Sequence, residues 1–116
     1  MEIIETKKND ISIFKLNGRL DSNTSPSLEK QLAGAMEDGA VNMIIDFKEL
    51  DYISSAGLRI ILKTTKDLRR FDGQIILCSM QDYVKEVFEI AGFDSFLPIV
   101  ATLDDALVKL QNLPSS

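Results

Sequence analysis

The apolar segment from Val41 to Phe47 is the feature that most restricts how this chain can fold. Its large apolar residues are Val41, Met43, Ile44, Ile45 and Phe47. A strand with one face in water alternates apolar and polar residues, whereas a strand buried on both faces is apolar almost throughout. The segment therefore predicts a central strand that is covered on both faces.

Strand-like and helix-like segments alternate along the rest of the chain. The first strand is expected from Ile3 up to a turn at 7–10, and further strands are expected at 11–16, 41–47, 74–78 and 96–100. Helices are expected after Ser25, Ser55, Ser79 and Thr102. The first two strands are close enough to pair as a hairpin, and the later alternation predicts parallel strands with right-handed crossovers. We therefore expect a single α/β domain over residues 1–116, with 113–116 frayed. Its sheet should be small, mixed and mostly parallel, with four to five strands and about four helices packed on it.

Capping and stop signals mark the ends of these elements. The expected helix starts are Ser25 before Pro26, Ser79 with Asp82, and Thr102 with Asp105. The expected breaks are Gly18, Gly39, Gly73 and Gly92.

Two features of the composition exclude classes of function. The chain contains no histidine, and histidine is the commonest general base and the commonest metal ligand. Its net charge is −5, and no stretch resembles a basic arm for the phosphate backbone of nucleic acid. We therefore expect neither an enzyme nor a metal site, cofactor or nucleic-acid partner.

The termini and the cysteine content predict a cytoplasmic protein that does not bind membranes. Residues 1–5 carry acids where a signal peptide has basic residues, and no apolar run approaches the roughly 18 residues of a membrane span. The single cysteine, Cys78, cannot form an internal disulfide, and it ends an apolar strand. We expect its thiol to be buried and inert.

Two polar loops stand where partners usually meet an open α/β sheet, at the carboxyl ends of strands. One runs from Leu20 to Ser25, and the other runs from Ile53 to Leu58. In the second loop a serine hydroxyl adjoins a helix N-terminus, which favours negative charge. A serine at this position can also simply cap the helix.

The second loop lies within the segment Asp46-Phe47-Lys48-Glu49-Leu50-Asp51-Tyr52-Ile53-Ser54-Ser55-Ala56-Gly57-Leu58, which resembles the signature of STAS domains. It is most similar to that of the bacterial anti-sigma-factor antagonists. Gly18-Arg19-Leu20-Asp21 is similar to the family's segment before the first helix, and Val84 to Phe96 is similar to a later one. The resemblance covers nearly the whole chain in the correct order.

The resemblance implies that Ser55 is phosphorylated, with Ser54 as the alternative. The unmodified antagonist would bind an anti-sigma factor that is also a serine kinase, and would thereby free the sigma factor. Phosphorylation would then separate the complex, and a serine phosphatase would reset it. We expect the free protein to be a monomer. The residues expected at the partner interface are Asp21, Ser22, Asn23, Ser54, Ser55, Ala56, Gly57, Leu58 and Arg59.

Several of these residues have a simpler structural interpretation. Asp21 can tie down its own loop, and Leu58 can belong to the core. Basic residues recur along one face of the second helix, either as a solvated face or as a steering strip for an acidic partner. They are Arg59, Lys63, Lys66 and Arg70.

Two other functions would require features that the sequence lacks, and a third is open. A serine hydrolase would place glycine where Ile53 stands, and it would lack a histidine base. A nucleotide-binding module would need a glycine-rich phosphate loop, and the sequence has none. A docking domain of the same fold could instead serve another partner-switching circuit, a stress complex or a transport assembly.

Overall fold

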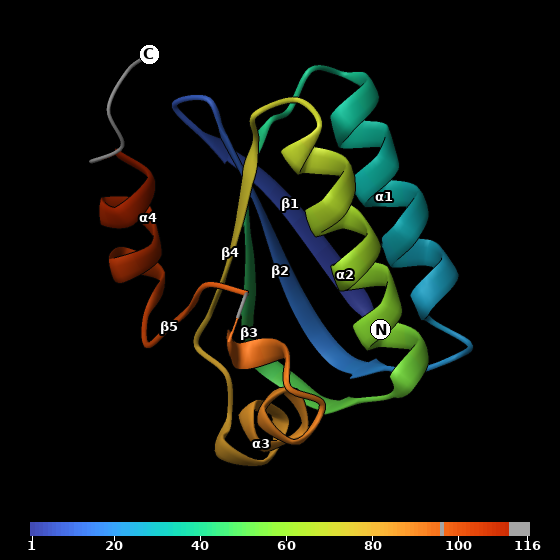
Figure 1. Ribbon diagram of the computed structural model, residues 1–116. Helices are drawn as coiled ribbons and strands as arrows, with labels where there is room; N and C mark the ends of the chain where they lie inside the picture. The colour runs from blue at the N-terminus through green and yellow to red at the C-terminus, as the bar shows by residue number, and fades with distance from the viewer. Residues whose placement is uncertain (96, 112–116) are drawn as a thin grey trace.

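The computed structural model describes residues 1–95 and 97–111, and over these ranges the chain forms a five-stranded sheet in the order β1-β2-β3-β4-β5. β1 pairs antiparallel with β2, and every other neighbouring pair is parallel. This confirms the expected mixed sheet with its antiparallel strand at one edge (Figure 1). The strands are β1 (Glu2–Lys8), β2 (Ile11–Leu20), β3 (Asn42–Ile53), β4 (Gln74–Cys78) and β5 (Ile99–Val100). The helices are α1 (Ser25–Glu37), α2 (Ser55–Arg69), α3 (Asp82–Ile90) and α4 (Leu103–Gln111), with a 3-10 turn at Phe93–Ser95.

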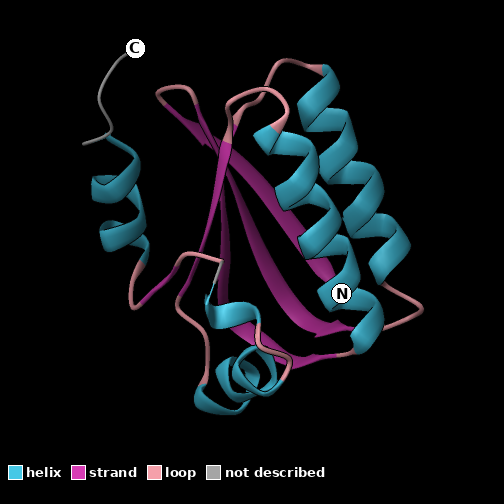
Figure 2. Ribbon diagram, in the orientation of Figure 1, coloured by secondary structure: helices cyan, strands magenta, loops and turns pink. Residues whose placement is uncertain are grey.

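The helices lie on both faces of the sheet, as the apolar segment in β3 requires. Figure 2 shows α1 and α2 on one side of the strands and α4 on the other. The larger core cluster joins the first face to α1, α2 and α3 through residues such as Leu28, Ile61 and Phe88. Phe88 meets Phe47 of β3 edge to face, with ring centroids 5.8 Å apart. Residues 43–47 are all buried, so β3 is a central strand as predicted.

The second core cluster lies between the other sheet face and α4. Isoleucines from β2, β3 and β4 pack there, with Cys78, against Ala106, Leu107 and Leu110 of α4. Burial raises the pKa of the Cys78 thiol to about 11, although the Ser79 hydroxyl acts in the opposite direction. The thiol is buried, as expected.

The prediction that Gly18 ends the second strand is wrong. β2 continues through Gly18 to Leu20, and its register against β3 shifts at two places, between Lys15 and Asn17 and between Gly18 and Arg19. Gly18 has φ +116°, a conformation that glycine adopts without steric cost. The irregularities therefore bend the strand without ending it.

Two predicted helix starts are displaced. Thr24 is the N-cap of α1, so Ser25 is already helical, and the Ser25 hydroxyl donates to the Asp21 carbonyl instead.

The start of α3 is displaced as well. Ser79 has φ +62°, and α3 begins only after Gln81. The side-chain amide of Gln81 donates to the carbonyls of Lys48 and Leu50. The Thr102 cap is confirmed, because its hydroxyl accepts from the Asp105 N–H.

The strand expected over 96–100 is shorter than predicted. Only Ile99–Val100 pairs with β4, because Leu97 is turned into the core and its N–H donates to the Phe93 carbonyl. Pro98 has no N–H to offer a neighbouring strand. Phe96 and the expected frayed tail, 113–116, lie outside the described residues.

Candidate partner-docking site at the carboxyl ends of β2 and β3

The two polar loops come together because β2 and β3 are neighbours and end in register. Leu20 pairs with Ile53, and the Ser54 N–H donates to the Leu20 carbonyl at 2.9 Å. α1 follows the first loop and α2 follows the second, so the N-termini of both helices lie at this end of the sheet (Figure 1). We call the two loops together with the first turns of α1 and α2 the serine face.

The two adjacent serines have different surroundings. Ser54 is the N-cap of α2, is half-buried, and accepts a hydrogen bond from the Gly57 N–H at 3.4 Å. Ser55 is the first residue of α2 and is exposed, and its hydroxyl bonds to none of the residues that the structure describes. The capping role therefore belongs to Ser54, and Ser55 presents its hydroxyl to solvent.

Asp21 organises the first loop. Its carboxylate accepts from the N–H groups of Asn23 and Thr24 at 2.9 and 3.1 Å. Partial burial favours the protonated carboxyl, but these bonds, the Thr24 hydroxyl and the charge of Arg19 outweigh it and lower the pKa of Asp21. Ser22 and Asn23 are exposed at the tip of the loop. Asp21 thus has the structural role that the sequence allowed for.

Gly57 sets how closely the two loops pack. A Cβ atom added at Gly57 would lie 2.7 Å from Cγ of Leu20 and 3.0 Å from Cγ1 of Ile53. Leu58, the next residue, is buried in the main core cluster, so it is a core residue and not part of an exposed contact rim.

A groove of about 310 Å³ lies between α1 and α2, and Ala56, the residue after Ser55, is one of those that line it. Across it, the Lys63 ammonium donates to Glu29 of α1 at 2.9 Å, and this bond together with the Glu29 charge raises the pKa of Lys63. Arg59 also lines the groove, and it forms no ion pair with any residue in 1–95 or 97–111. The lining residues are Ser22, Ser25, Pro26, Glu29, Ala56, Arg59, Ile60 and Lys63.

The roles of three residues at this end of the molecule were not identified from the sequence. Pro26 and Glu29 reach the groove because α1 packs beside α2, and a pairing of helices is not visible in local periodicity. Arg19 stacks its guanidinium 4.2 Å from the ring centroid of Tyr52, because the two residues are register partners on β2 and β3. No signal in the sequence gives that register, since two irregularities precede it.

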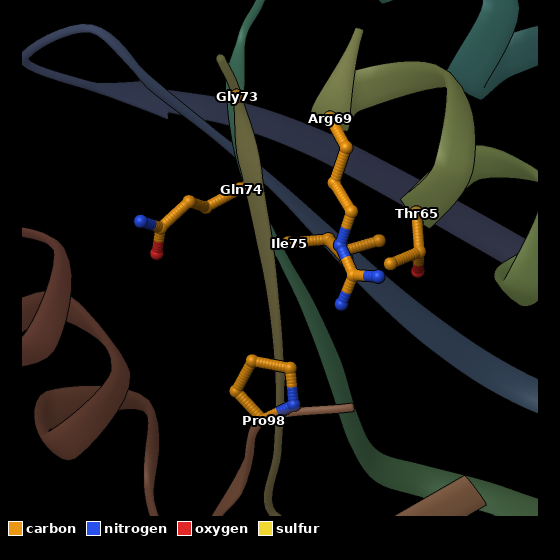
Figure 3. Close-up of a pocket in the computed structure, with 6 residues that line it drawn as sticks. All are labelled: Thr65, Arg69, Gly73, Gln74, Ile75 and Pro98. Carbon is orange, nitrogen blue, oxygen red and sulfur yellow. The ribbon is translucent and has the colours of Figure 1, made fainter. Parts of the chain in front are cut away.

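Another pocket, of about 270 Å³, lies at the opposite end of α2 and collects none of the predicted site residues. In Figure 3 the Arg69 side chain extends from α2 toward Pro98, between Thr65 and Ile75. The lining residues are Thr65, Arg69, Gly73, Gln74, Ile75 and Pro98.

The described part of the chain also lacks two kinds of feature. No cluster of three or more cysteine, aspartate or glutamate side chains within residues 1–95 and 97–111 could hold a metal ion. None of the helices in these ranges has the length and apolar character that crossing a membrane requires.

Comparisons with known proteins agree with this geometry. Residues 2–106 match the family model described as the STAS domain. A Bordetella bronchiseptica protein named "Putative anti-sigma factor antagonist BtrV" is 38% identical over 106 residues, which is 91% of each chain. The anti-sigma-B factor antagonist of Staphylococcus aureus is 26% identical over 99 residues, 85% of this chain and 92% of that protein.

The fold is also that of SpoIIAA, an anti-sigma factor antagonist and cell-fate determinant of Bacillus. The unphosphorylated form is 19% identical, with a TM-score of 0.78 over 97% of this chain and 100% of that chain. The phosphorylated form is 20% identical, with a TM-score of 0.74 over 94% and 99%. The family model spans nearly the whole chain, and the two adjacent serines directly follow β3 in a fold that matches these structures. The chain therefore belongs to the STAS domain family.

Proposed function

We propose that this domain is an anti-sigma factor antagonist that works by partner switching. The unmodified form binds an anti-sigma factor that is also a serine kinase, and binding releases the sigma factor. Phosphorylation of Ser55 ends that binding, and a serine phosphatase restores it. The names of the two curated relatives support the antagonist role, and SpoIIAA, which has this fold, has been solved both with and without phosphate.

The observation that carries the proposal is the difference between the two serines. Ser54 uses its hydroxyl to cap α2, whereas the hydroxyl of Ser55 is exposed and free of bonds to the described residues. A kinase needs an accessible hydroxyl, so Ser55 is the better acceptor. Asp21, Ser22, Asn23, Ala56, Gly57 and Arg59 then frame the surface that the partner meets.

Electrostatics explains why a phosphate would separate the partners without unfolding the domain. Phosphoserine carries about −1.5 to −2 charges at neutral pH, and at a helix N-terminus this charge is locally favourable. Between two packed surfaces the same charge costs several kcal/mol unless it is paired. About 2.7 kcal/mol already weakens binding a hundredfold, so the interface term exceeds the local stabilisation.

The test uses the full chain, ATP and the anti-sigma factor kinase of the source organism. We expect mass spectrometry to place one phosphate on Ser55. Ser55→Ala should abolish phosphorylation but still bind the kinase, and Ser54→Ala, the matched control, should still be phosphorylated. Phosphate on another side chain would contradict the proposal.

Release of the sigma factor is a separate measurement. The unmodified chain should displace the sigma factor from a preformed complex with the anti-sigma factor, and the phosphorylated chain should not. Binding to a partner without displacement would instead indicate a docking module of another assembly.

A further inference from the structure

The two cations that line the groove between α1 and α2 differ in whether they are already paired. Lys63 is held by Glu29 at 2.9 Å across the groove between α1 and α2. Arg59 is exposed and lies on the same groove, but it has no ion pair with any residue of the described ranges. The guanidinium of Arg59 is therefore the cation that remains available to an incoming anion.

Arg59 can reach an anion on either of two sides. It stands four residues after Ser55 on α2, so the two side chains are neighbours on one helix face, with Cβ atoms about 6 Å apart. It also borders the groove beside Pro26, Ala56 and Ile60, whose apolar atoms suit an apolar side chain of a partner. A carboxylate next to that side chain would meet Arg59 at the rim.

The two anions would compete for one guanidinium. A phosphate on Ser55 is tethered within reach and carries up to two charges, whereas a partner carboxylate carries one charge and must be brought in by binding. The phosphate should therefore form the ion pair with Arg59 whenever Ser55 is phosphorylated.

We propose that Arg59 is a switch residue that pairs with a carboxylate of the anti-sigma factor in the unmodified complex and with the Ser55 phosphate after modification. This inference rests on the proposed function and adds a second effect of phosphorylation. The phosphate adds negative charge to the interface, and it also removes the cation that the partner's acidic group requires. The expected partner segment carries an apolar side chain beside an aspartate or glutamate.

The phosphate half of the switch can be measured without any partner. The full chain is produced with phosphoserine at position 55, and the ³¹P signal is followed against pH. Free phosphoserine has its second pKa at about 6, and pairing with Arg59 should lower it. Arg59→Gln should raise that pKa by about 0.15–0.4, whereas Arg70→Gln, at the far end of α2, should leave it unchanged. Equal pKa values in the wild type and Arg59→Gln would overturn the capture of Arg59 by the phosphate.

The partner half is measured with the purified anti-sigma factor by calorimetry. Arg59→Gln should weaken binding of the unmodified chain by about two- to fivefold, and Arg70→Gln should not. The ratio between unmodified and phosphorylated affinities should shrink by a similar factor in Arg59→Gln. In the wild type only the unmodified form has Arg59 available to the partner, whereas in Arg59→Gln neither form does. An unmodified affinity equal to that of the wild type would overturn the pairing with the partner, and an unchanged ratio would overturn the competition. A wild-type chain that binds no anti-sigma factor would contradict the proposed function, while the ³¹P titration still decides the phosphate half.

Discussion

At the scale of single residues, Gly57 explains why the serine face tolerates no side chain at one position of α2. A methyl group at this buried position would press on Leu20 and Ile53 at 2.7–3.0 Å. Both neighbours belong to the main core cluster and cannot move freely. We predict that Gly57→Ala destabilises the fold by about 1–3 kcal/mol, although alanine favours a helix.

Gly34 provides the matched control, because it lies inside α1 and a Cβ atom there would contact nothing within 4 Å. Gly34→Ala should stabilise the domain by about 0.5–1 kcal/mol. Urea denaturation of both variants measures the two effects. If Gly57→Ala were as stable as the wild type, the tight packing of the two loops would not be needed.

The two loops of the serine face were identified from the sequence, but which hydroxyl caps each helix could not be determined from it. Capping signals are reliable only to about one or two residues, because adjacent polar residues compete for the same amides. The prediction chose Ser25 where Thr24 is the N-cap of α1, and it left open whether Ser54 or Ser55 caps α2. Only the three-dimensional structure shows which hydroxyl has no partner among the described residues.

At the scale of elements, α4 is the one helix among the described residues that covers the second face of the sheet, and Cys78 lies beneath it. Leu110 of α4 is 7% exposed and packs in the same cluster. We predict that Leu110→Ala costs about 2–4 kcal/mol and makes the Cys78 thiol react faster with a disulfide reagent such as DTNB. In the wild type the thiol should be nearly unreactive at pH 8, because it is buried and its pKa is raised to about 11.

Val108 lies on α4 as well but is 53% exposed, so Val108→Ala is the control. It should change the free energy of unfolding by less than about 0.5 kcal/mol and leave the thiol protected. Equal DTNB rates in Leu110→Ala and the wild type would mean that α4 does not control access to Cys78.

Periodicity predicted the elements better than their ends. The continuous apolar segment of β3 and the amphipathic stripes of the helices were identified, because burial imposes those patterns directly. The strands β2 and β3 run further than predicted, because irregular register lets a strand continue through Gly18 and through residues 48–52, in which buried Leu50 stands among exposed residues. β5 is shorter, because a proline and a core leucine interrupt it.

At the scale of the whole molecule, the proposed switch requires a domain whose fold does not respond to negative charge at Ser55. Ser25 and Ser55 test this requirement together, because each is the first residue of its helix. Ser55 is exposed, whereas Ser25 is 2% exposed and donates to the Asp21 carbonyl. A negative charge should therefore be tolerated at Ser55 and should destabilise the fold at Ser25.

We predict that Ser55→Asp keeps the far-UV circular dichroism of the wild type and changes the free energy of unfolding by no more than about 1 kcal/mol, with a gain favoured by the helix dipole. Ser25→Asp should lose about 2–4 kcal/mol, because a buried carboxylate cannot donate to the carbonyl and faces the charge of Asp21. Urea titrations monitored by circular dichroism compare the two.

Aspartate carries less charge than phosphate, so the phosphorylated chain should be measured beside Ser55→Asp. Gross loss of helix in either Ser55 form would mean that modification acts by unfolding the domain, and the separation of fold from interface would be wrong.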